Sequence, residues 1–215
     1  MATIALVDDH SLLRNSLELL IRSFGHTVIF HAANGVELEE AITNHPLPDI
    51  LLLDINMPIK DGYATAVWLK ENHPGVRVIA LSVHDDDLAI IRMLRNGVRG
   101  YLIKDCQAEE LETAIEQVMD KGFYHSDIVS SQLVKGISAI GHSSGSVSNF
   151  LKITEREETF IQLSCSDLTY KEIAIEMKVS IRTVDSYRDS VFEKLHVKSR
   201  SGLVTFAFKH RLVMV

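Results

Sequence analysis

Apolar runs of strand length alternate with segments of helical length along the first half of the chain. The runs are TIALV (3–7), TVIF (27–30), ILLL (50–53), VRVIALS (76–82) and GYLI (100–103). In the first helical segment Leu13, Leu17 and Leu20 share one side. Strands that alternate with helices predict right-handed crossovers and a parallel sheet covered on both faces. We therefore expect a five-stranded doubly wound α/β domain, whose last helix ends at Gly122.

The last third of the chain has helical patterns without strand alternation. Four helical segments there each follow a residue suited to an N-cap: Thr154, Thr169, Ser180 and Ser199. A Glu lies three residues after each of the two threonines, which is the spacing of a capping box. The apolar positions of the third segment fall on one stripe: Val184, Val191 and Leu195. Four short helices joined by tight turns predict an all-α helix-turn-helix domain.

A change in composition separates these two patterns. The stretch GHSSGSVSN at 141–149 is rich in Gly and Ser and almost uncharged, which is typical of a flexible tether. We place one domain at residues 1–122, a linker at 123–149 and the helical domain at 150–215.

Charge is distributed unevenly between the two predicted domains. The net charge is −7, yet residues 150–215 carry 11 Lys and Arg against 9 Asp and Glu, a net of +2 that leaves −9 for the rest. Such asymmetry fits an acidic domain joined to one that faces nucleic acid.

The composition also argues for a cytoplasmic protein. An apolar fraction of 46% supports a hydrophobic core, while the N-terminus lacks a basic segment and no apolar stretch approaches the length of a membrane span. The two cysteines, Cys106 and Cys165, lie in no ligand spacing and are treated as ordinary thiols. The ten histidines are scattered, which favours surface or core histidines over metal ligation.

Polar residues follow four of the five predicted strands. Asp8 and Asp9 follow the first strand, Asp54 the third, Ser82 the fourth and Lys104 the fifth. Because the carboxyl ends of parallel strands share one edge of a sheet, we expect these residues to converge. Three neighbouring carboxylates repel one another unless a divalent cation and an ammonium offset them. Mg²⁺ prefers oxygen ligands and phosphate, so the pattern predicts a magnesium site for phosphoryl chemistry.

Each of these residues has an ordinary alternative when taken alone. Asp8 or Asp9 could cap a helix that starts near Ser11, Ser82 could form a turn, and Lys104 could be a solvated residue at a helix start. The combination favours the site, because five polar residues at strand ends are of the types that complete one metal–phosphate centre.

Two sets of motifs resemble known families. VDDH, LLLDINMPIKDG, ALS and GYLIKD resemble the receiver domains of two-component response regulators, and ITEREE, YKEIA, SIRTVDSY and KLHVKSR resemble the LuxR-type helix-turn-helix. The chain is therefore identified as a member of the NarL/FixJ family of response regulators. The resemblance implies a flavodoxin-like sheet of strand order 2-1-3-4-5.

The resemblance also implies a role for each rim residue. Asp54 would accept a phosphoryl group from a sensor histidine kinase, with Lys104 and Ser82 binding its oxygens. Mg²⁺ would be bound by the acidic residues and by one backbone carbonyl: Asp8, Asp9, Asp54 and Asn56. Tyr101 would be an aromatic switch that turns inward when Ser82 moves; the alternative is an ordinary strand aromatic. Such a domain phosphorylates itself and is not expected to turn over a substrate.

The third helix of the second domain would read double-stranded DNA, and the protein would act as a homodimer on adjacent half-sites. The candidate DNA contacts are Arg182, Thr183, Asp185, Ser186, Tyr187, Lys194, Lys198 and Arg200. Asp185 and Asp189 depart from the family pattern, and Arg188 falls where an apolar residue is common. Lys194 and Lys198 could instead form a solvated face. Asp167 stands where the family often has Gly, and Asp tolerates the left-handed conformation such a turn needs.

Two other functions stay open at this point. An aspartate-nucleophile phosphatase would use an Asp two residues after the nucleophile as general acid, but residue 56 is Asn. A helix-turn-helix used only for protein contact is the second alternative, because Asp185 and Asp189 weaken attraction to DNA.

Overall fold

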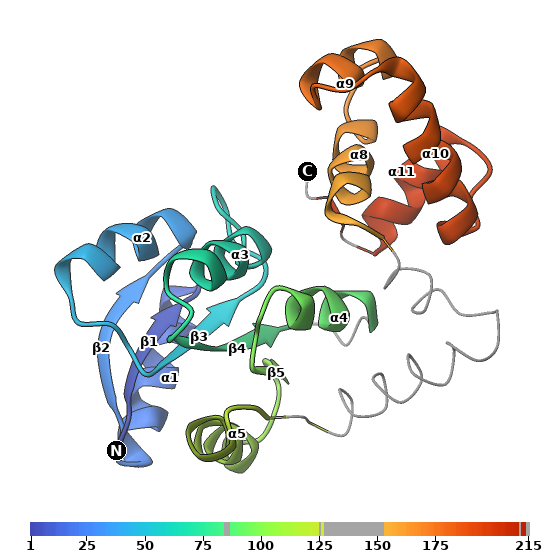
Figure 1. Cartoon of the computed structure of the whole chain (residues 1–215). Helices are drawn as coiled ribbons and strands as arrows, with labels where there is room; N and C mark the ends of the chain where they lie inside the picture. Colours follow the sequence, from blue (N-terminus) through green and yellow to red (C-terminus); the bar gives the residue numbers. More distant parts are fainter. Residues whose placement is uncertain (84–86, 125, 127–152, 211, 214–215) are drawn as a thin grey trace. The chain divides into compact units, whose positions relative to one another are not determined.

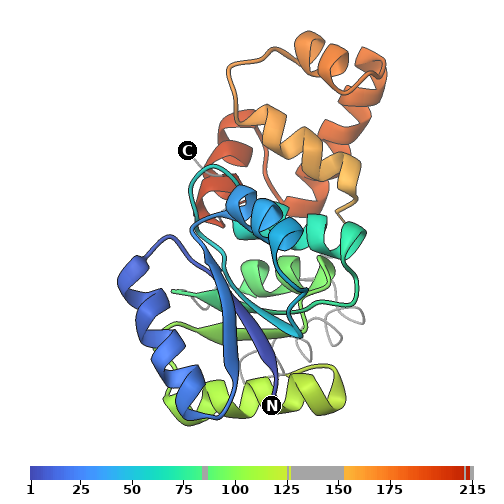
Figure 2. The same ribbon diagram turned by 90° about the vertical axis from the view of Figure 1, so that its left-hand side faces the viewer.

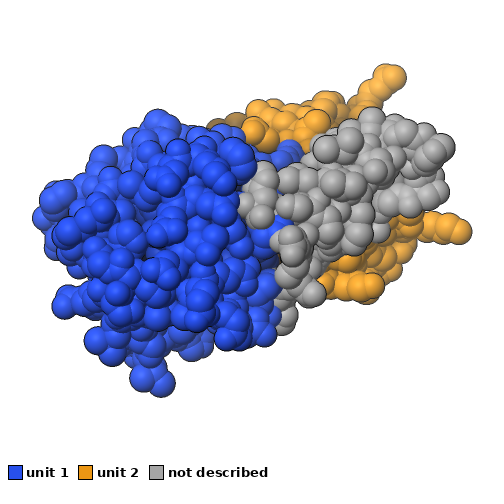
Figure 3. Space-filling view, turned by 90° about the horizontal axis from the view of Figure 1, so that it is seen from below, with its two compact units in different colours: residues 1–85, 90–132 blue, residues 86–89, 133–215 orange. Residues whose placement is uncertain are grey.

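The computed structural model describes residues 1–83, 87–124, 126, 153–210 and 212–213. These residues belong to two compact units, drawn in different colours in Figure 3. One unit holds a sheet with its flanking helices, and the other holds the helices from residue 153 onward. The predicted linker lies outside the described residues except for 123, 124 and 126. None of the described helices is long and apolar enough to cross a membrane.

The first unit is built on a five-stranded parallel sheet (Figure 1). Its strands are β1 (Thr3–Val7), β2 (Thr27–Ala32), β3 (Ile50–Asp54), β4 (Arg77–Ser82) and β5 (Gly100–Ile103). They are arranged in the order β2-β1-β3-β4-β5, which confirms the predicted fold and strand order. The strand bounds differ from the apolar runs by at most two residues at either end.

Helices cover both faces of this sheet (Figure 2). They are α1 (Ser11–Ser23), α2 (Gly35–Asn44), α3 (Gly62–Asn72), α4 (Asp87–Arg95) and α5 (Ala108–Lys121). Ile21 of α1 and Leu111 and Ile115 of α5 pack with Ile4 and Leu52 of the sheet in one buried cluster. This cluster covers one face. Every residue of β3 is buried, and because side chains alternate between the faces of a strand, the sheet is covered on both faces, as an all-parallel sheet requires.

The sheet unit extends beyond the predicted boundary at residue 122. Tyr124 is 9% exposed and belongs to the buried cluster under α5. Its backbone N–H donates to Arg99 O at 2.8 Å, and its hydroxyl donates to Glu110 Oε1 at 3.2 Å. Tyr124 is thus a core residue of this unit rather than the start of a tether.

The second unit contains α8 (Glu155–Ser164), α9 (Tyr170–Glu176), α10 (Ile181–Leu195) and α11 (Arg200–Lys209) among its described residues. Thr154 and Thr169 each form the predicted capping box with the Glu three residues later. Ser180 and Ser199 cap α10 and α11 through their side chains. All four predicted N-caps are therefore confirmed, because each depends only on neighbouring residues.

The structure decides two smaller points. The alternative that Asp8 or Asp9 caps α1 is excluded: the N-cap is His10, whose side chain makes no capping hydrogen bond. The turn before Asp167 forms without Gly, closed by Cys165 and Ser166, whose N–H groups donate to Gln162 O and Leu163 O. Asp167 is not among the non-glycine residues with positive φ, so its tolerance of the left-handed conformation is not used.

Gly62, at the start of α3, brings this helix against the end of β3. Its N–H donates to Ile55 O at 2.9 Å, and a Cβ added there would lie 2.3 Å from Asp54 O and 2.7 Å from Ile55 Cα. Both are backbone atoms, so neither can rotate away. Only glycine permits this approach.

We predict that Gly62→Ala lowers the free energy of unfolding by about 1–3 kcal/mol, the usual cost of forcing extra atoms into a packed site. Gly75→Ala is the matched control, because a Cβ there would have no neighbour within 4 Å. Urea unfolding followed by the fluorescence of Trp68, the single tryptophan and a residue of α3, measures both variants. Equal stability of the two variants would contradict the prediction.

Candidate functional site: an acidic centre and a reading helix

The sheet brings Asp8, Asp54 and Lys104 together at the carboxyl ends of its strands. Asp8 follows β1, Asp54 ends β3 and Lys104 follows β5. Lys104 Nζ lies 2.7 Å from Asp8 Oδ2 and 2.8 Å from Asp54 Oδ2. One ammonium therefore bridges two carboxylates that are distant in sequence.

Both bridged carboxylates are buried. Asp8 and Asp54 are each 1% exposed, and the Lys104 side chain is 10% exposed. Buried carboxylates are rare unless they are paired or bind a metal. Here two negative charges share one positive charge, which leaves the buried group with a net negative charge.

Burial, with repulsion from Asp8, raises the pKa of Asp54 above its ordinary value of 3.8, against the opposing effect of Lys104. For Lys104, burial favours the neutral amine, but the hydrogen bonds and charges of Asp54 and Asp8 outweigh it and raise the pKa. Lys104 therefore stays in its charged form, whereas the ionised form of Asp54 is energetically disfavoured.

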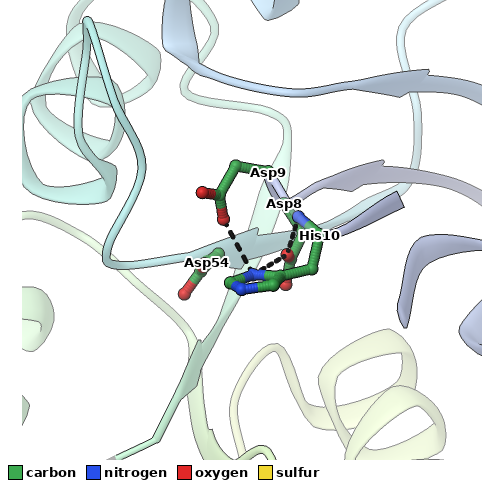
Figure 4. Close-up of side chains that lie close together, drawn as sticks. All are labelled: Asp8, Asp9, His10 and Asp54. Atoms are coloured by element: carbon green, nitrogen blue, oxygen red, sulfur yellow. Dashed lines mark hydrogen bonds and ion pairs between the residues drawn. The ribbon is translucent and has the colours of Figure 1, made fainter. Parts of the chain in front are cut away.

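A third carboxylate and an imidazole complete the cluster (Figure 4). Asp8, Asp9, His10 and Asp54 each offer a ligand atom within 4.8 Å of the others. His10 Nδ1 lies 2.9 Å from Asp9 Oδ1, and its backbone N–H donates to Asp8 Oδ1 at 2.8 Å. Carboxylate oxygens at this spacing, with a net negative charge, suit a hard divalent cation.

The remaining predicted rim residues lie around this cluster. The Asn56 N–H donates to Asp54 Oδ1 at 3.2 Å, which places the Asn56 backbone beside the carboxylate. Ser82 ends β4, is 3% exposed and accepts the Lys104 N–H through its carbonyl at 2.6 Å. Tyr101 is 1% exposed, so its ring already points inward, beside a cavity of about 140 Å³.

The predicted DNA contacts in α10 and in the turn after it divide into exposed or half-buried residues and residues that form ion pairs. Arg182, Ser186 and Lys198 are exposed, while Thr183 and Tyr187 are half-buried. Asp185 Oδ1 lies 2.8 Å from Arg188 Nη1, and Asp189 Oδ1 lies 2.8 Å from Arg188 Nη2.

Two of the predicted DNA contacts bind other parts of their own unit. Lys194 Nζ lies 2.6 and 2.7 Å from the two carboxylate oxygens of Glu157, which is 4% exposed. Arg200 donates to Ser164 O at 2.9 Å and to Ser166 O at 2.8 Å. Lys194 is therefore held by a carboxylate of its own unit, and both cations stabilise the position of α8.

The sequence prediction does not include His10 in the acidic cluster, although its position directly after Asp8 and Asp9 is the available signal. Lys171 and Lys178, which are also absent from the predicted contacts, are exposed on α9 and on the turn before α10. Their position next to the predicted reading helix makes them further candidates for DNA contact.

Comparison with known families gives two matches. Residues 4–116 match the family described as response regulator receiver domain, and residues 151–207 match bacterial regulatory proteins of the luxR family. Over its whole length the chain is similar to the oxygen regulatory protein NreC of Staphylococcus carnosus, with 28% identity over 214 residues and 98% of each chain covered.

Solved structures are similar over the same extent. The RcsB response regulator of Salmonella typhimurium has a TM-score of 0.60 at 19% identity, covering 97% of this chain and 100% of that one. The response regulator ChrA of a heme-sensing two-component system has a TM-score of 0.52 at 25% identity, covering 98% of both chains.

The buried Glu157 gives the helical unit a pH-dependent stability. Burial alone would raise its pKa, but the hydrogen bonds from Lys194, Ser190 and Thr154 outweigh burial and lower the pKa below 4.5. A lowered pKa stabilises the folded state above pH 4.5 and loses this effect as the pH falls through the folded pKa.

We therefore predict that Glu157→Gln destabilises this unit by roughly 2 kcal/mol near pH 7 and that the deficit shrinks as the pH falls below 4.5. Hydrogen exchange of the α8 and α10 amides reports this unit separately from the sheet. The exposed Glu193→Gln is the control and should change little at any pH. A deficit that persists unchanged in acid would contradict the prediction.

Proposed function

The chain belongs to the response regulators that join a receiver domain to a LuxR-family DNA-binding domain, and from this premise we propose that phosphorylation of Asp54 controls DNA binding. A sensor histidine kinase is the proposed donor. The observation that supports this most directly is the Lys104 ammonium held between Asp8 and Asp54 at one edge of the sheet.

The transfer step follows from the position of Asp54. One carboxylate oxygen attacks the phosphorus of a phosphohistidine, an O–P bond forms, and the N–P bond breaks with its electron pair going to the histidine nitrogen. Lys104 and Ser82 would bind oxygens of the phosphoryl group. Mg²⁺, held by oxygens of Asp8, Asp9 and Asp54 and by the Asn56 carbonyl, would offset the negative charge. Little else is needed, since phosphoryl transfer depends on positioning and charge stabilisation.

Phosphorylation gives Asp54 a charge of about −2 and three acceptor oxygens. Lys104 would move to pair with the new phosphoryl oxygens. Ser82, at the end of the neighbouring strand β4, would also move toward them. We propose Tyr101, which is buried beside a cavity, as the aromatic residue whose position responds. A local charge change thereby becomes a change between two arrangements of the unit.

For the DNA-binding unit we propose a revised set of contacts, in which Lys171 and Lys178 replace Lys194 and Arg200. Its members are exposed or half-buried residues that no buried partner holds: Lys171, Lys178, Arg182, Thr183, Asp185, Ser186, Tyr187 and Lys198. A homodimer would place two copies of α10 on adjacent half-sites of duplex DNA. A cytoplasmic location goes with this function.

We propose that the chain accepts a phosphoryl group on itself and turns over no separate substrate. A phosphatase of the aspartate-nucleophile type would need a second acid two residues after Asp54, where Asn56 presents only its backbone N–H to the Asp54 carboxylate.

We predict that a small phosphoramidate donor with MgCl₂ adds one phosphoryl group to the full chain, detected by intact mass. Asp54→Asn and chelation of the metal should each abolish the addition, because one removes the nucleophile and the other the charge compensation. Asp61→Asn is the control: it lies in the same loop, and Asn preserves the N-cap bond to Ala64 N. Undiminished phosphorylation of Asp54→Asn would place the acceptor elsewhere.

DNA binding is tested with a pool of random-sequence duplexes and beryllium fluoride as phosphoryl mimic. We predict that the mimic raises the affinity for the selected duplexes roughly tenfold, a typical coupling between two sites. Asp54→Asn should bind these duplexes equally with and without the mimic. Equal affinity of the unsubstituted protein in both states would remove phosphorylation as the switch, and no binding to any duplex would favour a protein-contact role for α10.

A further inference from the structure

The reading helix α10 carries an exposed cluster of Asp185, Arg188 and Asp189. Besides its two contacts of 2.8 Å, the guanidinium donates from Nε to Asp189 Oδ1 at 3.0 Å. The side chains of Arg188, Asp185 and Asp189 are 31%, 44% and 70% exposed. All three are therefore within reach of solvent and of a ligand that docks on α10.

Arg188 is held in place from the protein side as well. It lies on the stripe that α10 buries, one turn after Val184 and before Val191, so its stem is oriented toward the protein interior. Its guanidinium lies 5.7 Å from the centre of the Tyr170 ring, in cation–π contact. The ring is fixed in turn by Arg200, 5.5 Å from its centre, which donates hydrogen bonds to the end of α8.

The outward face of α10 consequently has no excess of positive charge. Apart from Ile181 at its start, the exposed residues of α10 repeat at helical spacing and carry one positive and two negative charges: Arg182, Ser186, Asp189 and Glu193. Non-specific affinity for DNA comes from Lys and Arg side chains that neutralise phosphates. A helix that presents carboxylates to DNA, and whose Arg188 is paired with Asp185 and Asp189, gains little affinity from that attraction.

We propose that Asp185 and Asp189 are specificity-determining residues of this domain, because they hold Arg188 away from DNA phosphates. This proposal rests on the proposed DNA-binding function. A carboxylate in the major groove is repelled by phosphates unless it accepts a hydrogen bond from the N4 amino group of cytosine. The cluster therefore disfavours arbitrary sequences and favours sites with cytosine under α10. Repulsion weakens binding to the wrong sites, and the hydrogen bond from cytosine strengthens binding to the right ones.

The test measures affinity for a labelled duplex of arbitrary sequence at increasing NaCl, using the full chain with beryllium fluoride. The double variant Asp185→Asn, Asp189→Asn should bind this duplex roughly tenfold more tightly at low salt. The slope of log affinity against log salt should become steeper by about 1 per bound protomer, because the freed Arg188 reaches a phosphate. Adding Arg188→Met to the double variant should reverse the steepening.

Two controls separate the cluster from other effects. Arg188→Met alone, which keeps an apolar stem against Tyr170, should leave the slope of the unsubstituted protein unchanged. Glu155→Gln with Glu176→Gln makes the same change of net charge on exposed residues of α8 and α9 and should have a much smaller effect. An unchanged slope in the Asp double variant, a flatter slope in Arg188→Met alone, or an equal effect of the Glu pair would each overturn the proposal.

Base preference is read by sequencing duplexes selected from a random pool. The unsubstituted protein should enrich sites with cytosine at defined positions, and the Asp double variant should lose that preference at one or more of them. Identical selected motifs would overturn the proposal while leaving the proposed function intact. Absence of any duplex binding by every variant would overturn both.

Discussion

The acidic centre depends on one ammonium, that of Lys104, lying between two buried carboxylates. Asp8 and Asp54 come from strands that are neighbours in the sheet, and their charges would repel in a region from which water is excluded. Burial, with the repulsion from Asp8, keeps the pKa of Asp54 raised, so Lys104 offsets only part of the energetic cost of ionising Asp54. The apolar core under β1 and β3 must therefore hold a site that is unfavourable by itself, a common property of functional centres.

This constraint explains why the site could be predicted from the sequence whereas several contacts could not. An Asp at the end of an apolar run is visible in the sequence, and parallel topology then forces Asp8, Asp54 and Lys104 to one edge. N-caps such as Thr154 were equally predictable, because a cap involves only residues within one turn. In both cases a local pattern and one general rule of topology were sufficient.

Lys194 and Arg200 required knowledge of tertiary neighbours. Lys194 binds Glu157, 37 residues earlier, and Arg200 binds carbonyls at the end of α8, 36 and 34 residues earlier. On a helix facing solvent either cation would have been available to phosphates, and nothing in its own segment indicates otherwise. Tyr124 was misplaced for the same reason, since its partners Arg99 and Glu110 lie in earlier elements.

The same arrangement of one cation between two carboxylates occurs in both units, and burial decides what each can do. Around Lys104 the carboxylates are buried and the charges act through a medium of low polarity, so an added phosphoryl group changes the local balance strongly. Around Arg188 the carboxylates are 44% and 70% exposed, and solvent screens the pairs. Exposed ion pairs of this kind contribute little to the free energy of unfolding. Their main physical consequence is therefore their effect on a polyanion that approaches α10. A buried arrangement of this kind suits a site that responds to a single phosphoryl group. An exposed one suits a surface that binds only a few of the phosphates that DNA presents to it.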